Sequence, residues 1–146
     1  MTRQEKALQL FENNFNCSQS VFAAFAADLN LPEDTCLKIA TPFGAGISRQ
    51  QLTCGAVTGA LMVLGMCFGK GRQDADAKKQ ETYNITIEFL KRFRGKNRSI
   101  ACRDLLEGLN MNNPEEFALI QERNMFTTHC NCFVTDAVSI LEEITG

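Results

Sequence analysis

One apolar segment constrains the fold more than any other part of the sequence. It runs from Cys54 to Gly69, and none of its sixteen residues is charged. A membrane-spanning helix needs about 20 apolar residues, so we expect this shorter, glycine-rich segment to form the central helix of a protein core, with no membrane span. Thr53 is its expected N-cap. Small residues give this helix a smooth face that another backbone can approach closely: Gly55, Ala56, Gly59 and Ala60.

The rest of the chain has a helical pattern as well. Apolar side chains recur at spacings of three and four residues, and the alternation typical of a strand occurs nowhere. Helix-start signals at Thr2, Asn16, Pro32 and Asn113 precede several of these stretches. Helices are predicted from Thr2 to about Asn13, from Asn16 toward Leu29, from Pro32 to before Pro42, from Cys54 to about Gly69, from Asp74 to about Arg94, from Ala101 to about Glu107, from Asn113 onward, and from about Cys130 through Leu141. The sequence therefore predicts an all-α, single-domain bundle of about six to eight helices over residues 1–146.

Charge and composition argue against several classes of function. The formal net charge is −2 and the sequence pI is about 5.4, which gives no overall field that attracts nucleic acid or an anionic membrane. Residues Met1 to Lys6 lack the apolar core of an export signal. We therefore expect a cytoplasmic protein that does not bind nucleic acid.

Seven cysteines, at positions 17, 36, 54, 67, 102, 130 and 132, are the main indication of function. Cys36 and Cys67 lie inside predicted helices, where we expect buried and inert thiols. The other five lie near predicted helix starts. The amides of a helix N-terminus can lower the pKa of a thiol from about 8.5 into the neutral range, so we expect reactive thiolates there.

No two of these cysteines form a Cys-x-x-Cys motif, so neither a thioredoxin-type site nor a paired zinc knuckle can be local. Any site must be assembled by the fold. His129, the single histidine, precedes Cys130 and is a candidate base or metal ligand beside the thiols.

Four segments, in this order, resemble one known family. They are Asn16-Cys17-Ser18-Gln19, the run TCGAVTGA from Thr53 to Ala60, Cys102-Arg103-Asp104-Leu105-Leu106, and Cys130-x-x-x-Val134-x-Asp136-Ala137. From Asn16 to Glu143 the chain resembles the C_GCAxxG_C_C family, which is labelled redox-active and whose Cys-Gly-Ala-x-x-Gly core is matched without a gap by CGAVTG, residues 54–59.

The resemblance implies which cysteines form the site. The four recurring cysteines of the family correspond to Cys17, Cys54, Cys102 and Cys130, the last by its spacing to Val134 and Asp136, with Cys132 as the near alternative. We expect these four thiols to lie together in one pocket, with Cys36 and Cys67 outside it. Thr53, Gly55 and Gly59 are expected to support the site, because the glycines admit another segment close to Cys54 while Thr53 and the helix amides hold its thiolate.

Three functions remain open. The first is thiol–disulfide or electron-transfer chemistry, as in a thiol-dependent oxidoreductase, with a redox partner that is a protein or a small molecule. The second is a metal-binding module in which the same four cysteines hold zinc or a [2Fe–2S] cluster, with Cys132 and His129 as alternative ligands. The third is a structural or sensor subunit without turnover. A homodimer formed through the glycine and alanine face is a further hypothesis.

Overall fold

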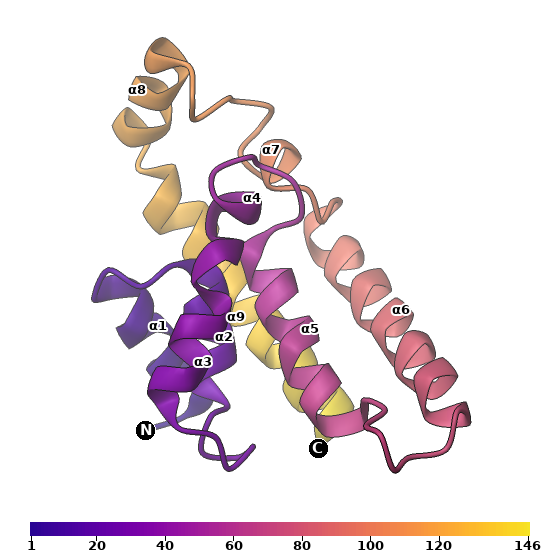
Figure 1. Ribbon diagram of the computed structural model, residues 1–146. Coiled ribbons are helices and arrows are strands. Elements are labelled where there is room, and N and C mark those ends of the chain that lie inside the picture. Colours follow the sequence, from indigo (N-terminus) through magenta and orange to yellow (C-terminus); the bar gives the residue numbers. More distant parts are fainter.

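The apolar segment forms helix α5 (Gly55–Phe68) in the computed structural model, which describes residues 1–146 (Figure 1). Helix α2 (Cys17–Ala24) packs against one side of α5, and the two long helices α6 (Ala77–Asn97) and α9 (Met125–Thr145) pack against the others. Because α5 contacts all three, it is the central helix that the sequence predicts. No helix combines the length and apolar character that crossing a membrane requires.

Four further α-helices bring the total to eight, within the predicted range. They are α1 (Arg3–Glu12), α3 (Glu33–Ala40), α7 (Cys102–Leu105) and α8 (Pro114–Glu122). A single 3₁₀ turn, η1 (Thr41–Phe43), follows α3, and the short element α4 (Gly44–Ile47) is a left-handed turn and not an ordinary helix. The chain contains no strand beyond one isolated bridge between Thr53 and Ala101, so the all-α prediction is confirmed.

Side-chain caps explain why several helix starts were readable from the sequence. The Asn16 side chain accepts a hydrogen bond from the Gln19 amide, and the Gln19 side chain accepts one from the Asn16 amide, both at 2.9 Å. Thr2 caps α1 in a similar way, by accepting from the Glu5 amide at 3.0 Å. Asn113 caps α8. Each cap satisfies amide donors that the first turn leaves unpaired.

Two predicted helix starts are wrong. Cys54, and not Thr53, is the N-cap of α5, because residues 52–54 are held in an extended pairing in which the Cys54 amide donates to the Ile100 carbonyl at 2.7 Å. The last helix begins at Met125, well before Cys130. Asn124 has a left-handed backbone that separates α9 from α8, and the fully buried Met125 anchors the new helix.

The glycine face of α5 is covered by α2 of the same chain. A Cβ atom built at Gly59 would lie 2.5 Å from the Ser18 carbonyl oxygen, and one at Gly55 would overlap the Cys17 Sγ atom. The expected close approach is therefore present, but it is made within one chain. This removes the argument for a homodimer that was based on this face.

We predict that Gly59→Ala destabilises the protein by about 1–3 kcal/mol, because α2 must move to accommodate the added methyl group. Gly65 lies on the same helix, and a Cβ atom added there would have no neighbour within 4 Å. Gly65→Ala should therefore raise the free energy of unfolding by about 0.5–1 kcal/mol through helix propensity alone. Urea unfolding measures both variants, and equal effects would contradict the packing described for α2 and α5.

Candidate functional site

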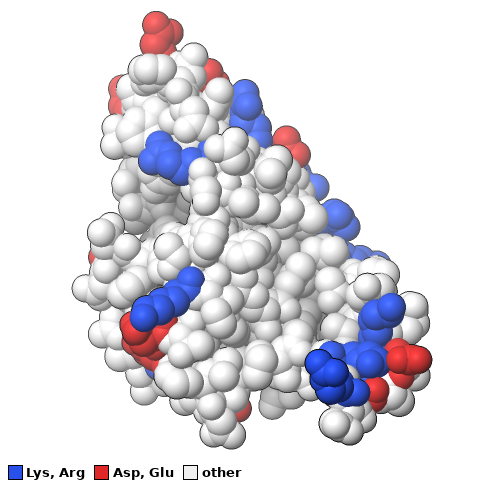
Figure 2. Space-filling model, in the orientation of Figure 1, with Lys and Arg blue, Asp and Glu red and all other residues white.

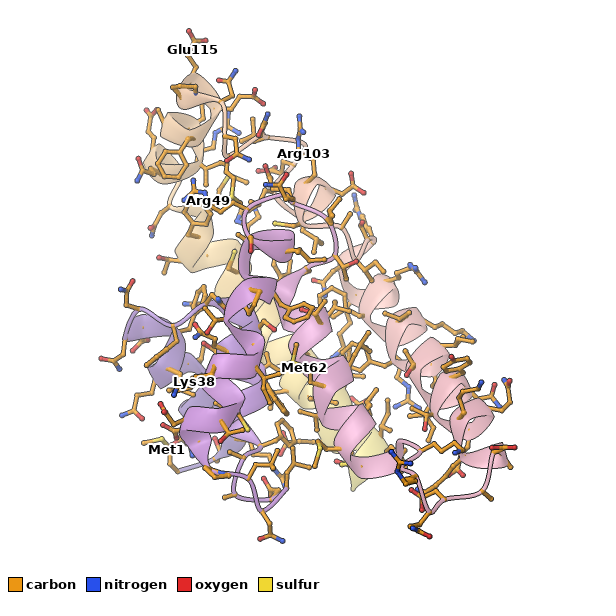
Figure 3. All side chains as sticks on the ribbon, viewed as in Figure 1. Met1, Lys38, Arg49, Met62, Arg103 and Glu115 are labelled. Atoms are coloured by element: carbon orange, nitrogen blue, oxygen red, sulfur yellow. The ribbon has the colours of Figure 1, made fainter.

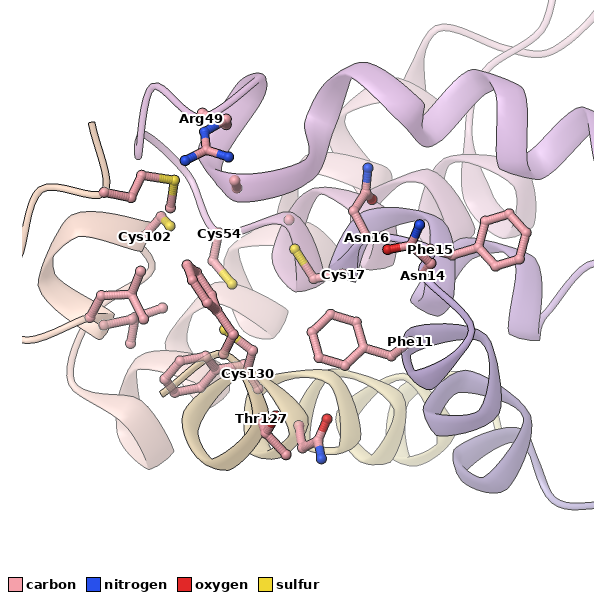
Figure 4. Close-up of a pocket in the computed structure, with 18 of the residues that line it drawn as sticks. Phe11, Asn14, Phe15, Asn16, Cys17, Arg49, Cys54, Cys102, Thr127 and Cys130 are labelled. Atoms are coloured by element: carbon pink, nitrogen blue, oxygen red, sulfur yellow. The ribbon is translucent and has the colours of Figure 1, made fainter. Parts of the chain in front are cut away.

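Four cysteines that are distant in sequence line one pocket of about 710 Å³ (Figure 4). They are Cys17, Cys54, Cys102 and Cys130, the set that the sequence placed together. Cys17 and Cys130 are partly exposed, whereas Cys54 and Cys102 are 5% and 9% exposed. Of the four residues, Cys17 and Cys130 are thus the more accessible, and Cys54 and Cys102 are buried.

Each thiol comes from a different element of the fold. Cys17 is the first residue of α2, Cys54 caps α5, Cys102 opens α7, and Cys130 lies in the second turn of α9. The segments that carry Cys54 and Cys102 are joined directly, because the Cys102 amide donates to the Leu52 carbonyl at 2.6 Å. The buried apolar residues form a main core and a second, smaller cluster made of Cys102, Leu106, Met111, Ile120 and Met125. The Cys130 side chain packs against both, so it lies where the two clusters meet.

Gly55 has a specific role in this arrangement. Gly55 directly follows Cys54 in the chain. The Cys17 Sγ atom occupies the space that a side chain at position 55 would fill. Thr53 and Gly59 do not line the pocket. Of the three supporting residues that the sequence predicted, Gly55 contacts a site thiol. Gly59 contacts the backbone of Ser18, the residue after Cys17.

A left-handed turn forms part of the pocket wall. Five successive residues, from Ala45 to Arg49, have φ between 49° and 69°, a conformation that costs about 1–2 kcal/mol for each residue with a side chain. The Gln51 and Leu52 amides donate to the Ala45 and Gly46 carbonyls at 3.1 and 2.9 Å and hold the turn closed. Sequence reasoning missed this element. Strained backbone that persists next to a pocket is typical of functional sites.

Burial raises the pKa of every thiol in the pocket. The pKa rises to about 12 for Cys102 and Cys130, with the neighbouring Cys17 as the second cause. For Cys54, burial and then the Cys17 thiol raise the pKa well above its ordinary value. Burial also raises the pKa of Cys17, although the backbone amides of Ala45, Ser18 and Gly55 act in the opposite direction.

The predicted lowering of the thiol pKa by helix N-termini is therefore wrong. The loss of hydration on burial destabilises a thiolate by more than the hydrogen bonds from nearby amides stabilise it. In addition, α7 has only four residues, and Cys130 lies within α9 and not at its start. The raised pKa values favour the neutral form of all four thiols.

The remaining candidates lie outside the pocket. Cys36 is buried as expected, but Cys67 is exposed near the end of α5, so the prediction of a buried thiol there is wrong. Cys132 is exposed on α9. His129 Nε2 lies 3.6 Å from a Glu107 carboxylate oxygen, and its Nδ1 lies 3.0 Å from the Thr128 hydroxyl, so both ring nitrogens have polar neighbours outside the pocket.

The thiols do not form a ready metal centre. Nowhere in the chain are three or more Cys, His, Asp or Glu side chains arranged so that they could hold one metal ion. All seven cysteines are free thiols in this structure, so no disulfide is formed either. The alternative ligands expected from the sequence, Cys132 and His129, are outside the pocket.

The pocket also contains residues that the sequence did not indicate. Its walls are mostly hydrophobic and include five phenylalanines, and one arginine, Arg49, lines it together with these rings. The Arg49 guanidinium lies over the Phe117 ring, 5.4 Å from its centroid. The aromatic residues that line the pocket are Phe11, Phe15, Phe117, Phe126 and Phe133.

Comparison with protein-family models gives one match. The model described as "Putative redox-active protein (C_GCAxxG_C_C)" matches residues 15–144, a range that contains all four pocket cysteines. The chain belongs to the C_GCAxxG_C_C family. Comparisons with curated proteins and with solved structures found no match. The four cysteines that the resemblance assigns to the recurring positions of the family are the ones that line the pocket.

We predict that the reduced protein loses stability as the pH rises above about 8.5, the ordinary thiol value. Below that pH the thiols are protonated in both the folded and the unfolded chain. Above it only the unfolded chain releases these protons, so the free energy of unfolding falls by up to about 1.4 kcal/mol per pH unit for each buried thiol.

Urea unfolding with a reductant, repeated across this pH range, measures the slope. Cys102→Ala should make the slope shallower, because it removes a thiol whose pKa is raised to about 12. Cys132→Ser changes an exposed thiol outside the pocket and serves as the control. A wild-type stability that does not change with pH would contradict the raised pKa values.

Proposed function

We propose that this C_GCAxxG_C_C protein performs thiol–disulfide exchange, with Cys17 as the attacking thiol and Cys54 as the resolving thiol. One observation carries the proposal: the Cys17 Sγ atom lies against Gly55, the residue after Cys54, at the wall of an open pocket. Figure 4 draws the Cys17 and Cys54 side chains next to each other in that wall. The family description as redox-active supports chemistry at these sulfurs.

The surroundings of the two thiols support different roles for them. Cys17 is the more exposed of the pair, and the amides of Ala45, Ser18 and Gly55 favour negative charge on its sulfur. A thiolate is the attacking species in exchange, so stabilisation of charge during attack matters even where the resting thiol is neutral. Cys54 is buried next to Cys17, a position that suits a thiol that reacts second.

The reaction has two balanced steps. The Cys17 sulfur attacks one sulfur of a substrate disulfide, forms a mixed disulfide, and releases one substrate thiol that carries away the Cys17 proton. The Cys54 sulfur then attacks the Cys17 sulfur, the bond to the substrate breaks, and the second substrate thiol leaves with the Cys54 proton. The substrate is reduced by two electrons, and the protein is oxidised to a Cys17–Cys54 disulfide.

The raised pKa values favour electron donation. A dithiol becomes a strong oxidant in its disulfide form when its reduced form is stabilised as a thiolate. Burial works against the thiolate here and raises the pKa of Cys17 and Cys54. We therefore propose that the site acts as a reductant.

Cys102 and Cys130 are proposed to form a second dithiol of the same pocket. Each is close enough to Cys17 for the charge of that sulfur to raise its own pKa. Exchange between this pair and a Cys17–Cys54 disulfide conserves electrons and would restore the first pair. No step is assigned to a metal or cluster, because no three candidate ligands are arranged to share one ion.

We predict that Cys54→Ser stops the reaction at the mixed disulfide. After one equivalent of a small disulfide reagent and an acid quench, peptide mapping should find the reagent attached to Cys17 in this variant. The wild type should instead yield Cys17 and Cys54 peptides joined to each other or, after exchange with the second dithiol, joined Cys102 and Cys130 peptides, with no reagent attached. The serine hydroxyl cannot displace the bound thiol, which is the reason for the trap.

Cys67→Ser is the matched control, since it replaces an exposed thiol outside the pocket, and it should give the wild-type pattern. If Cys54→Ser and Cys67→Ser give the same peptides, the assignment of Cys54 as the resolving thiol is wrong. A structural or sensor subunit without exchange chemistry would show no joined peptides in any of the three proteins.

A further inference from the structure

The pocket holds a cation that no acidic side chain of the protein neutralises. Arg49 takes part in none of the ion pairs of the structure, and its guanidinium donates none of the side-chain hydrogen bonds. Resting on the function proposed above, we infer that the substrate is a small organic disulfide that carries a carboxylate, and that Arg49 binds this carboxylate.

The size and walls of the pocket favour a small organic molecule. A volume of about 710 Å³ is within the range of about 300–1,000 Å³ found for small-molecule sites. Most of the lining residues are hydrophobic, and five of them are phenylalanines. The Cys17 Sγ atom lies in this pocket against Gly55, so a substrate disulfide must enter the pocket to be attacked, which is easier for a small disulfide than for one on the surface of a folded protein.

Arg49 is held in position by its surroundings. Its carbonyl accepts a hydrogen bond from the Asn112 side chain at 2.8 Å, and its guanidinium lies over the Phe117 ring. Figure 3 places Arg49 beside α8, the helix that carries Phe117. Arg49 is an exposed residue whose backbone is held by Asn112 and whose guanidinium rests on Phe117, while the guanidinium donors stay free. A planar guanidinium with free donors suits a carboxylate, which it can bind through two parallel hydrogen bonds.

The same left-handed turn serves both the sulfur and the carboxylate. Ala45 begins the turn and directs its amide to the Cys17 thiol, and Arg49 ends it. A substrate held by Arg49 would therefore be positioned relative to Cys17 by one short backbone segment. Glu12, on α1, is the only other charged residue that lines the pocket. Charged side chains are also sparse over the middle of the face seen in Figure 2.

The test compares two aromatic disulfides, the dianionic dithiobis(nitrobenzoate) and the neutral dithiodipyridine, in their second-order rates of reaction at Cys17. Arg49→Gln should slow the first reagent by about tenfold or more, the size expected for loss of hydrogen bonds to a charged group, and leave the second unchanged. Arg49→Lys should retain part of the rate with the anionic reagent. Arg94→Gln, which removes a charge on α6 away from the pocket, should match the wild type with both.

The outcomes separate this inference from the proposed function. If both reagents modify Cys17 but Arg49→Gln slows them equally, or slows neither, then Arg49 does not recognise a carboxylate and the inference is overturned. If neither reagent reacts at Cys17 in the wild type, the proposed exchange function itself fails. A wild type that reduces a protein disulfide faster than either reagent would also overturn the assignment of a small substrate.

Discussion

The contact between the first turn of α2 and the glycine face of α5 is the constraint on which the rest of the site depends. Because positions 55 and 59 have no side chain, the Ser18 backbone can rest on α5 and the Cys17 sulfur can lie beside Cys54. The Asn16 and Gln19 cap fixes where α2 begins and therefore where Cys17 points. A methyl group at position 55 would occupy the place of that sulfur, so the exchange chemistry that we propose depends on the same packing contact.

Burial, more than helix polarity, determines the state of the thiols. The helix starts do place Cys17, Cys54 and Cys102 at the pocket, but the desolvation of a thiolate outweighs the amides that face it. The raised pKa values favour the protonated form of the resting thiols, and in the exchange reaction that we propose the protein would give up electrons as a dithiol. In that reaction the amides around Cys17, including the one supplied by the left-handed turn, would act mainly while charge develops on its sulfur.

The sequence predicted those parts of the structure that depend on local signals. Apolar spacing and the Thr2, Asn16 and Asn113 caps predicted the helices, and the family motif predicted which four cysteines meet. The left-handed turn from Ala45 to Arg49 was not predictable, because Gln51, whose amide helps to close the turn, is itself held by long-range bonds: its side chain donates to the Leu109 carbonyl and accepts from the Met111 amide. Arg49 was missed for the same reason. Pocket burial, which reversed the expected pKa shifts, is likewise a property of the assembled fold.

A potentiometric titration of the reduced protein at several pH values tests the central claim most directly. A buried, neutral dithiol that forms a disulfide exchanges two electrons and two protons, so its potential should fall by about 59 mV per pH unit. Because burial raises the pKa of both Cys17 and Cys54, this slope should continue above the ordinary thiol pKa of about 8.5. A one-electron couple, a slope that flattens at that pH, or the absence of any reversible couple in the metal-free protein would contradict the account.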